Sequence, residues 1–300
     1  MINRNCLHPR NFFVWLLYLF LRIITFLPYR VLIVLGESIG TLTGLLSTKR
    51  RRIAEINLQL CFPDMSGEQR NQILKEHFKS LGITLVEFSM YFWPDERLKP
   101  LVRIEGLEQL EKALAENRGV ILLAAHFTTT IVCARLLRLF TDLCAVYRKI
   151  NNKCMDHIIK TGSANTGAIL IPHDHLKEII NSLKKNIPVI YMPDQNFGMR
   201  HSIFVPFFGI PAATITATSR LSAINNIPVI PILLKRLPGY GGYKLIIERK
   251  LENFPTNDPV SDSLRINNII EDQVRENPAD YLWIHRRFKT RPKGDQSFYQ

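Results

Sequence analysis

The sequence has few cysteines and lacks any arrangement of them that would build a scaffold. Five cysteines are scattered through 300 residues, and no two form a C-x-x-C pair. An odd number of isolated thiols indicates a reducing compartment and argues against a disulfide framework. No zinc spacing, internal repeat or low-complexity segment is found. We therefore expect neither a metal site nor a cofactor, and we exclude a repeat array.

Acidic residues are also in short supply, with 26 against 39 Lys and Arg, which gives a formal charge of +13. Such a surplus suits polyanionic partners: nucleic acid, an anionic membrane leaflet, a phosphorylated lipid or an acidic carrier protein. The basic residues do not alternate with aromatic ones in the manner of a base-stacking surface. We therefore expect no nucleic acid partner.

A long uncharged apolar run is missing from the N-terminal region. Phe12–Leu21 is continuously apolar, but Arg22 follows before Ile23–Leu27. A bilayer span needs roughly 20 apolar residues, so this segment spans only if Arg22 snorkels to the headgroups. No small-residue cleavage site follows, which disfavours a signal peptide. The segment is expected to be a membrane anchor, as a short span or an in-plane helix; the alternative is a buried helix of a soluble domain.

The next apolar segment, Val31–Leu46, carries Gly36, Gly40 and Gly44 at intervals of four residues. That spacing permits close contact between helices. The basic run Lys49–Arg52 follows and is expected to bind phosphates at a cytoplasmic membrane surface. We expect an N-terminal membrane-associated helical segment over residues 1–48 and one catalytic domain over residues 49–300.

In the second part of the chain, short apolar runs alternate with helical patterns. This alternation predicts βαβ units and an α/β fold with a mostly parallel mixed sheet flanked by helices. Strands are predicted at Val102–Glu105, Val120–Ala125, Leu143–Tyr147, Ala168–Ile171, Ile187–Met192, Ile227–Leu234 and Tyr243–Leu251. Helices are predicted at Ile53–Cys61, Gly67–Tyr91, Leu107–Glu116, Asn151–Lys160, Asp174–Lys185, Thr214–Ile224 and Leu264–Glu276.

Polar residues follow several of the predicted strands directly. His126 comes after Val120–Ala125, Arg148 and Lys149 come after another strand, and Asp194 and Gln195 open a loop after a third. Open α/β sheets bind their ligands at the carboxyl ends of the strands. We therefore take His126 as the candidate catalytic residue and the other four as candidate substrate-binding residues. Structural roles are the alternatives: a capped loop for Asp194 and a solvated surface for the two cations.

These features occur within a longer set of motifs, which includes Tyr147-Arg-Lys-Ile-Asn-Asn152, Pro193-Asp-Gln-Asn-Phe-Gly198 and Tyr281-Leu-Trp-Ile-His-Arg-Arg-Phe-Lys-Thr-Arg291. The other matching segments are Arg51–Pro63, Glu76–Gly82, Gly119–His126 and Val205–Thr214. Together they span nearly the whole chain. With them, the sequence resembles the bacterial lipid A biosynthesis acyltransferases, the secondary acyltransferases that add lauroyl or myristoyl chains.

The resemblance implies a fold like that of the lysophospholipid acyltransferases, with a membrane-associated N-terminus at the inner membrane and a catalytic domain on the cytoplasmic face. It implies transfer of an acyl chain from acyl carrier protein to a hydroxyl of a Kdo-linked lipid A precursor. A glycerolipid acyltransferase would share the histidine chemistry, but the matching segments are those of the lipid A group. The C-terminal cations Arg286, Arg287, Lys289 and Arg291 are expected to serve a membrane or lipid-phosphate surface.

One residue departs from the family pattern, in which the histidine is followed after four residues by Asp or Glu. That position holds Ile131, which cannot accept a hydrogen bond from its side chain. Losing the orienting acid of a hydrolase triad lowers turnover by roughly 10⁴-fold. Two hypotheses remain: an active enzyme in which another group, such as Asp194, orients His126, or a degenerate member that acts as a lipid-binding or regulatory membrane protein.

Overall fold

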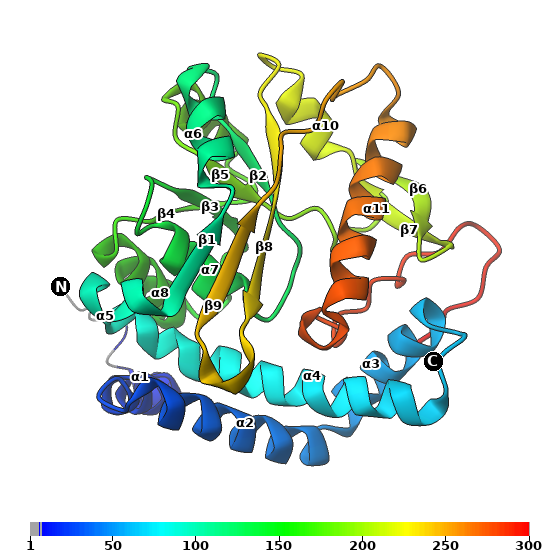
Figure 1. The fold of residues 1–300 in the computed structure, drawn as a ribbon. Coiled ribbons are helices and arrows are strands. Elements are labelled where there is room, and N and C mark those ends of the chain that lie inside the picture. Colours follow the sequence, from blue (N-terminus) through cyan, green and yellow to red (C-terminus); the bar gives the residue numbers. More distant parts are fainter. Residues whose placement is uncertain (1–5, 7, 300) are drawn as a thin grey trace.

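A central sheet organises the chain, of which the computed structural model describes residue 6 and residues 8–299. The sheet has seven strands. In spatial order these are β1 (Val102–Glu105), β9 (Tyr243–Ile247), β8 (Val229–Arg236), β2 (Ile121–Leu123), β5 (Val189–Tyr191), β3 (Cys144–Tyr147) and β4 (Ile169–Pro172). All neighbouring strands run parallel except β8 and β9. This confirms the predicted mostly parallel mixed sheet flanked by helices (Figure 1).

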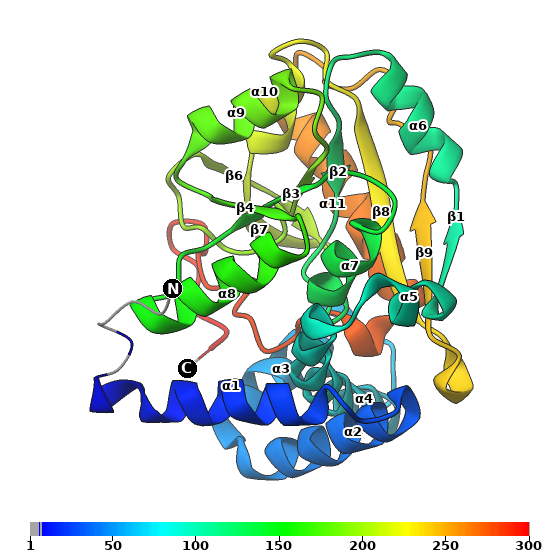
Figure 2. The same cartoon turned by 90° about the vertical axis from the view of Figure 1, so that its left-hand side faces the viewer.

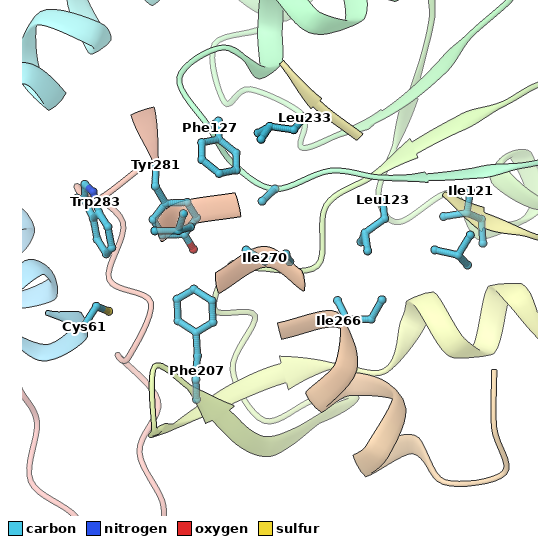
Figure 3. Close-up of a cluster of buried hydrophobic side chains, with 14 of the residues drawn as sticks. Cys61, Ile121, Leu123, Phe127, Phe207, Leu233, Ile266, Ile270, Tyr281 and Trp283 are labelled. Carbon is cyan, nitrogen blue, oxygen red and sulfur yellow. The ribbon is translucent and has the colours of Figure 1, made fainter. Parts of the chain in front are cut away.

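Helices cover both faces of the sheet, so its central strands are buried on both sides. Ile121 and Leu123 of β2 face one core, which Figure 3 shows with Ile266 and Ile270, whereas Leu122 faces the other. The first core contains residues of α3 (Thr48–Cys61), α9 (Leu176–Lys184), α10 (Ala217–Ser222) and α11 (Pro259–Glu276). The second contains residues of α5 (Asp95–Leu98), α6 (Leu107–Ala115) and α7 (Thr130–Leu137). Because both faces of the central strands are buried, segments such as Val120–Ala125 are continuously apolar.

The N-terminal segment forms two helices, one from each of the two apolar segments read in the sequence. α1 (Phe12–Ile24) ends before Pro28, and α2 (Tyr29–Leu46) begins after it. At 1.5 Å per residue α1 is about 20 Å long, too short to cross a bilayer. Among the described residues, only α2 is long and apolar enough to qualify as a span, by length and composition alone. The division into domains at residue 48 stays a prediction.

The glycines of α2 pack against α4 (Gly67–Glu87), and Figures 1 and 2 show the two helices side by side at the edge of the molecule. A Cβ on Gly40 would lie 2.2 Å from the Phe78 carbonyl oxygen, and one on Gly82 would lie 2.1 Å from that of Gly36. Backbone therefore touches backbone at this crossing. The glycine spacing read from the sequence does mark a close helix contact.

Between β5 and α10 the structure differs from the prediction. A separate antiparallel hairpin, β6 (Ser202–Phe207) and β7 (Ile210–Ile215), fills this region, and the helix expected from Thr214 begins only at Ala217. Proline has no backbone N–H to donate, so it argues against a strand inside a sheet. Pro206 and Pro211 are tolerated because they face each other in a two-stranded hairpin, in which each strand has only one hydrogen-bonded neighbour. The remaining elements are α8 (Lys153–Asn165), η2 (Pro9–Asn11), η3 (Phe88–Phe92), η4 (Lys99–Leu101), η5 (Pro238–Tyr240) and η6 (Pro278–Asp280).

The contact between α2 and α4 generates a stability prediction. Replacing Gly82 with Ala forces a methyl group into the backbone of α2, so we expect the free energy of unfolding to fall by about 2 kcal/mol. Urea unfolding followed by circular dichroism measures the change. Gly67→Ala is the matched control, because a Cβ there meets nothing within 4 Å. It should leave stability unchanged or raise it by up to about 1 kcal/mol. Equal stabilities of the two variants would contradict the proposed packing.

Candidate active site

His126 and Asp194 lie at equivalent positions beyond two neighbouring parallel strands. β2 and β5 are hydrogen-bonded in a register that pairs Leu123 with Tyr191. His126 follows Leu123 by three residues, and Asp194 follows Tyr191 by three. The carboxyl ends of parallel strands share one edge of the sheet, so the register brings the two side chains together.

The two residues make a double contact. The Nδ1 atom of His126 lies 2.7 Å from Oδ1 of Asp194, and the backbone N–H of His126 donates to Oδ2 at 3.0 Å. An ionised carboxylate only accepts hydrogen bonds, so Nδ1 carries the proton and Nε2 is left free to accept one. The Asp194 side chain is 1% exposed and the His126 side chain 23%. The imidazole thus has one edge against a buried acid and one edge accessible.

The environment of Asp194 favours its charged form. Burial by itself raises the pKa of this carboxyl, but the charge and hydrogen bonds of His126 and the nearby charge of Arg287 oppose it. Their combined effect lowers the pKa of Asp194 to about 2. The acid therefore remains ionised at any physiological pH.

The loop that carries His126 is held by the segment after α11. The backbone N–H of Leu282 donates to the His126 carbonyl at 2.9 Å, and that of Thr128 donates to the Asp280 carbonyl at 2.7 Å. The Thr128 hydroxyl also accepts from Arg236 at 3.0 Å, and the same guanidinium pairs with Asp280 and with the fully buried Glu87. A buried ionic network therefore fixes the position of the loop.

The loop that carries Asp194 is hydrogen-bonded to the same segment through Asn196. The backbone N–H of Asn196 donates to Nε2 of His285 at 3.1 Å, and Thr290 donates to the Asn196 side chain at 3.0 Å. Burial lowers the pKa of His285 to about 4, so this imidazole is neutral and can accept the bond. Neither His285 nor Asn196 was predicted as a site residue, although both lie in the motifs quoted above.

A large apolar cavity is lined by residues that lie close in sequence to the pair. Its volume is about 460 Å³, and its wall includes Thr130, four residues after His126, and Met192, two residues before Asp194. α1 forms another part of the wall with Val14, Leu17, Tyr18 and Leu21. Further lining residues are Leu85, Phe88, Tyr91, Phe92, Ile131, Ala134, Ala145, Val146, Tyr147, Ile150, Met155, Ile158, Ile159, Gly162, Ser163, Leu170 and Ile190. None of these described lining residues is charged.

The other candidate site residues lie around this edge of the sheet. Gln195 lines a small cavity together with His126, Asp194 and His285. Arg148 and Lys149 follow β3 and are exposed, and the Lys149 ammonium lies 3.0 Å from Nε2 of His175. Arg148 and Lys149 are thus at the same sheet edge as His126, but their side chains are on the surface. The structure gives them no contact with the His126–Asp194 pair.

The C-terminal cations divide into two groups. Arg286 and Lys289 are exposed. Arg287 is 2% exposed and donates to the Ala213 carbonyl and the Thr214 hydroxyl, both at 2.7 Å. Arg291 donates to the Pro211 carbonyl and pairs with Asp295. The expectation of a membrane or lipid-phosphate role is therefore wrong for Arg287, which holds the β6–β7 hairpin in place.

Comparison with known proteins decides the family. The chain matches the family described as bacterial lipid A biosynthesis acyltransferase over residues 2–290. The chain belongs to this family. It is 38% identical to the lipid A biosynthesis palmitoleoyltransferase of Escherichia coli K12, over 99% of this chain and 97% of the relative. It is 35% identical to the lauroyltransferase of that strain (98% and 96%) and 29% identical to its myristoyltransferase (99% and 93%).

The predicted membership of the lipid A acyltransferases is thus confirmed, and with it the assignment as an acyltransferase of lipid A biosynthesis. The acceptor implied by the family is a lipid A precursor. The sequence placed His126 and Asp194 at one sheet edge, and the structure adds that β2 and β5 are neighbours, which brings the two side chains into contact. The spacing of residues along the chain gave no signal for that contact.

The lowered pKa of Asp194 predicts how stability depends on pH. Its pKa falls from 3.8 to about 2 on folding, so its contribution is complete above pH 3.8 and is lost as the pH falls towards 2. The size of the shift corresponds to about 2 kcal/mol. Urea unfolding of the wild type and Asp194→Asn should show a stability difference at pH 5 that shrinks by this amount at pH 2. A difference that stays constant over this range would refute the lowered pKa.

Proposed function

We propose that this acyltransferase moves a fatty acyl chain from acyl carrier protein to a hydroxyl of a Kdo-linked lipid A precursor, with His126 as the general base and Asp194 as the acid that orients it. The observation that carries the proposal is the buried contact between His126 Nδ1 and Asp194 Oδ1 at 2.7 Å. The large apolar cavity, which Thr130 and Met192 line, gives an acyl chain a place to bind.

The chemistry requires a base, a stabilised imidazolium and a site that excludes water. With its proton fixed on Nδ1 by Asp194, the His126 ring offers Nε2 to the acceptor hydroxyl. As the hydroxyl oxygen attacks the thioester carbonyl, Nε2 takes its proton, and the buried carboxylate stabilises the positive charge on the ring. The tetrahedral intermediate then collapses, the carbon–sulfur bond breaks, and the proton on Nε2 can pass to the leaving thiolate.

The apolar cavity is the proposed site for the donor's acyl chain. Its volume of about 460 Å³ lies within the range of roughly 300–1,000 Å³ usual for small-molecule sites. The relatives are named for lauroyl, myristoyl and palmitoleoyl transfer, and long apolar chains of this kind suit an uncharged wall. Burial of methylene groups there supplies binding energy of about 0.8 kcal/mol for each.

The polar parts of the two substrates are assigned to the surface around the pair. Arg148 and Lys149 are proposed to bind a phosphate group, because both are exposed cations at the edge of the sheet where ligands bind. Gln195, next to Asp194, is proposed to contact the acceptor. The excess of 39 basic over 26 acidic residues favours both an acidic carrier protein and an anionic lipid.

The alternative function is that of a degenerate member without turnover, which would bind lipid or regulate a partner at the membrane. Ile131 favours it, because the position of the expected acid holds an apolar side chain. The contact between His126 and Asp194 argues against it, since the imidazole has an orienting carboxylate from another strand. We therefore favour the active enzyme.

We further propose that the N-terminal helices lie in the plane of the inner membrane, on its cytoplasmic face. One side of α2 is packed along α4, whose outer surface carries exposed charged residues such as Lys75, Glu76 and Lys79. α2 could therefore not cross a bilayer without drawing polar groups of α4 into it. The exposed apolar residues of α1 and α2 suit insertion into the interface instead, and they are Phe12, Phe13, Leu16, Leu19, Ile23, Val31, Val34, Leu42, Leu45 and Leu46.

Kinetics with acylated carrier protein and the lipid A precursor test the catalytic pair. Both His126→Ala and Asp194→Asn should lower turnover by about 10⁴-fold, because the base is lost in one variant and its orientation in the other. Asp272→Asn, the same exchange at a side chain that is 76% exposed on α11, should leave turnover unchanged. A wild type with no more product than His126→Ala would contradict the proposed function and favour the degenerate alternative.

Binding to vesicles tests the in-plane arrangement. Phe13 and Ile23 are 79% and 60% exposed on α1. Replacing both with Asp should weaken binding to anionic vesicles by about 100-fold or more. A 100-fold change corresponds to about 2.7 kcal/mol, and the loss of two large apolar contacts with lipid costs at least this much. Leu176→Asp on α9, an exposed apolar site on another side of the molecule, is the control and should have no effect. A protein that resists alkaline carbonate extraction from membranes would indicate a spanning helix.

A further inference from the structure

Ile131 lies in the first turn of α7 and has two defined contacts. Its carbonyl oxygen accepts a hydrogen bond from the Tyr91 hydroxyl at 2.8 Å, which anchors this turn to η3. Its side chain lines the large apolar cavity, next to Thr130 and Ala134 of the same helix. The residue that departs from the expected spacing of histidine and acid is therefore part of the cavity wall.

The surroundings of Ile131 do not suit a carboxylate. Among the described residues that line the cavity, none is charged. The Thr130 hydroxyl already donates to the Ala125 carbonyl and accepts from the Phe127 backbone N–H, and the Tyr91 hydroxyl donates to Ile131 itself. An acid at this position would meet mostly apolar groups such as Leu85, Phe88 and Met192, and burying it there would be costly.

The imidazole also has no need of a second acid. Asp194 occupies Nδ1 of His126 and leaves only Nε2, which the reaction requires free. Position 131 therefore need not supply the orienting acid that the family pattern places there. Its place in the wall, one residue after Thr130 and close to the catalytic loop, corresponds to the part of an acyl chain next to the reacting carbonyl.

We infer that Ile131 is a substrate-contacting residue that binds the first methylene groups of the donor's acyl chain. The identity of the chain rests on the proposed function. The exchange of an acid for isoleucine thus extends the apolar acyl site up to the reacting carbon. Restoring an acid at position 131 should impair the protein.

Acyl-chain binding is the direct test, and it does not require turnover. The probe is a fluorescent fatty acid displaced by dodecanoic, tetradecanoic or hexadecanoic acid from the full-length protein in detergent. Ile131→Ala should weaken binding by about tenfold, because roughly two buried methylene contacts are lost. Ile131→Glu should weaken it on the order of 100-fold, because a carboxylate replaces apolar wall. The loss should be equal for all three chain lengths, since the residue contacts the end of the chain that they share.

Two further variants complete the design. Ile169→Glu is the matched control, the same exchange at a side chain that is 49% exposed on β4 and outside the cavity, and it should bind like the wild type. Ile131→Thr, which keeps the branched shape and adds a hydroxyl, should weaken binding and replaces Ile131→Glu if thermal unfolding shows that the latter does not fold.

The outcomes separate this inference from the proposed function. Unchanged or tighter binding by Ile131→Ala and Ile131→Glu would overturn the inference, as would a gain in transfer activity on introducing Glu. A loss of affinity for hexadecanoic acid alone would also overturn it, because that pattern belongs to a residue at the far end of the cavity. If the wild type transfers no acyl chain but these variants still lose affinity, the proposed function fails, whereas the contact between Ile131 and a bound acyl chain stands.

Discussion

The contact between His126 and Asp194 depends on one structural constraint, the pairing of β2 with β5. These strands are adjacent and parallel, and their register places both residues at the same height beyond the sheet. A slip of one strand by one residue would turn its side chains to the opposite face and separate the two residues. The buried network of Arg236, Glu87 and Asp280 then holds the histidine loop, and His285 holds the aspartate loop by accepting the backbone N–H of Asn196. The pair thus comes from two strand ends, and residues from three other parts of the sequence hold its loops: Glu87, Arg236 and the segment from Asp280 to His285.

Sequence reasoning recovered the fold class, most strands and helices, and the residues at the ligand edge, because continuous apolar runs and helical periods are local signals. It left Asp194 between a loop cap and a partner of His126, since the order of strands in a sheet is set by tertiary packing. The hairpin β6–β7 was missed because its prolines hide a strand pattern, and Arg287 was taken as a surface cation because its burial depends on the distant residues Ala213 and Thr214.

Helix α1 has one apolar side towards the cavity and another that is exposed. One side of α1 lines the cavity through Leu17 and Leu21, and the other exposes Phe13 and Ile23. A single short helix therefore forms a wall between the proposed acyl chain and the proposed lipid surface. In Figure 2, α1 lies along the lower edge of the molecule, below α8. Ile131 of α7 lines the same cavity, which is therefore apolar up to the residues that follow the His126 loop. The departure from the family pattern is then consistent with an acyl site in which the acid comes from the loop after β5.

The most direct test of the account is proton and nitrogen NMR of histidine-labelled protein, with His126→Ala used to assign the His126 ring. We predict a downfield Nδ1–H resonance of His126, bonded to the carboxylate, at pH 7 in the wild type, and its loss or large upfield shift in Asp194→Asn. Ile131→Glu should leave that resonance in place. A His126 ring that carries its proton on Nε2, or a resonance unchanged in Asp194→Asn, would contradict the central claim that Asp194 orients the catalytic base.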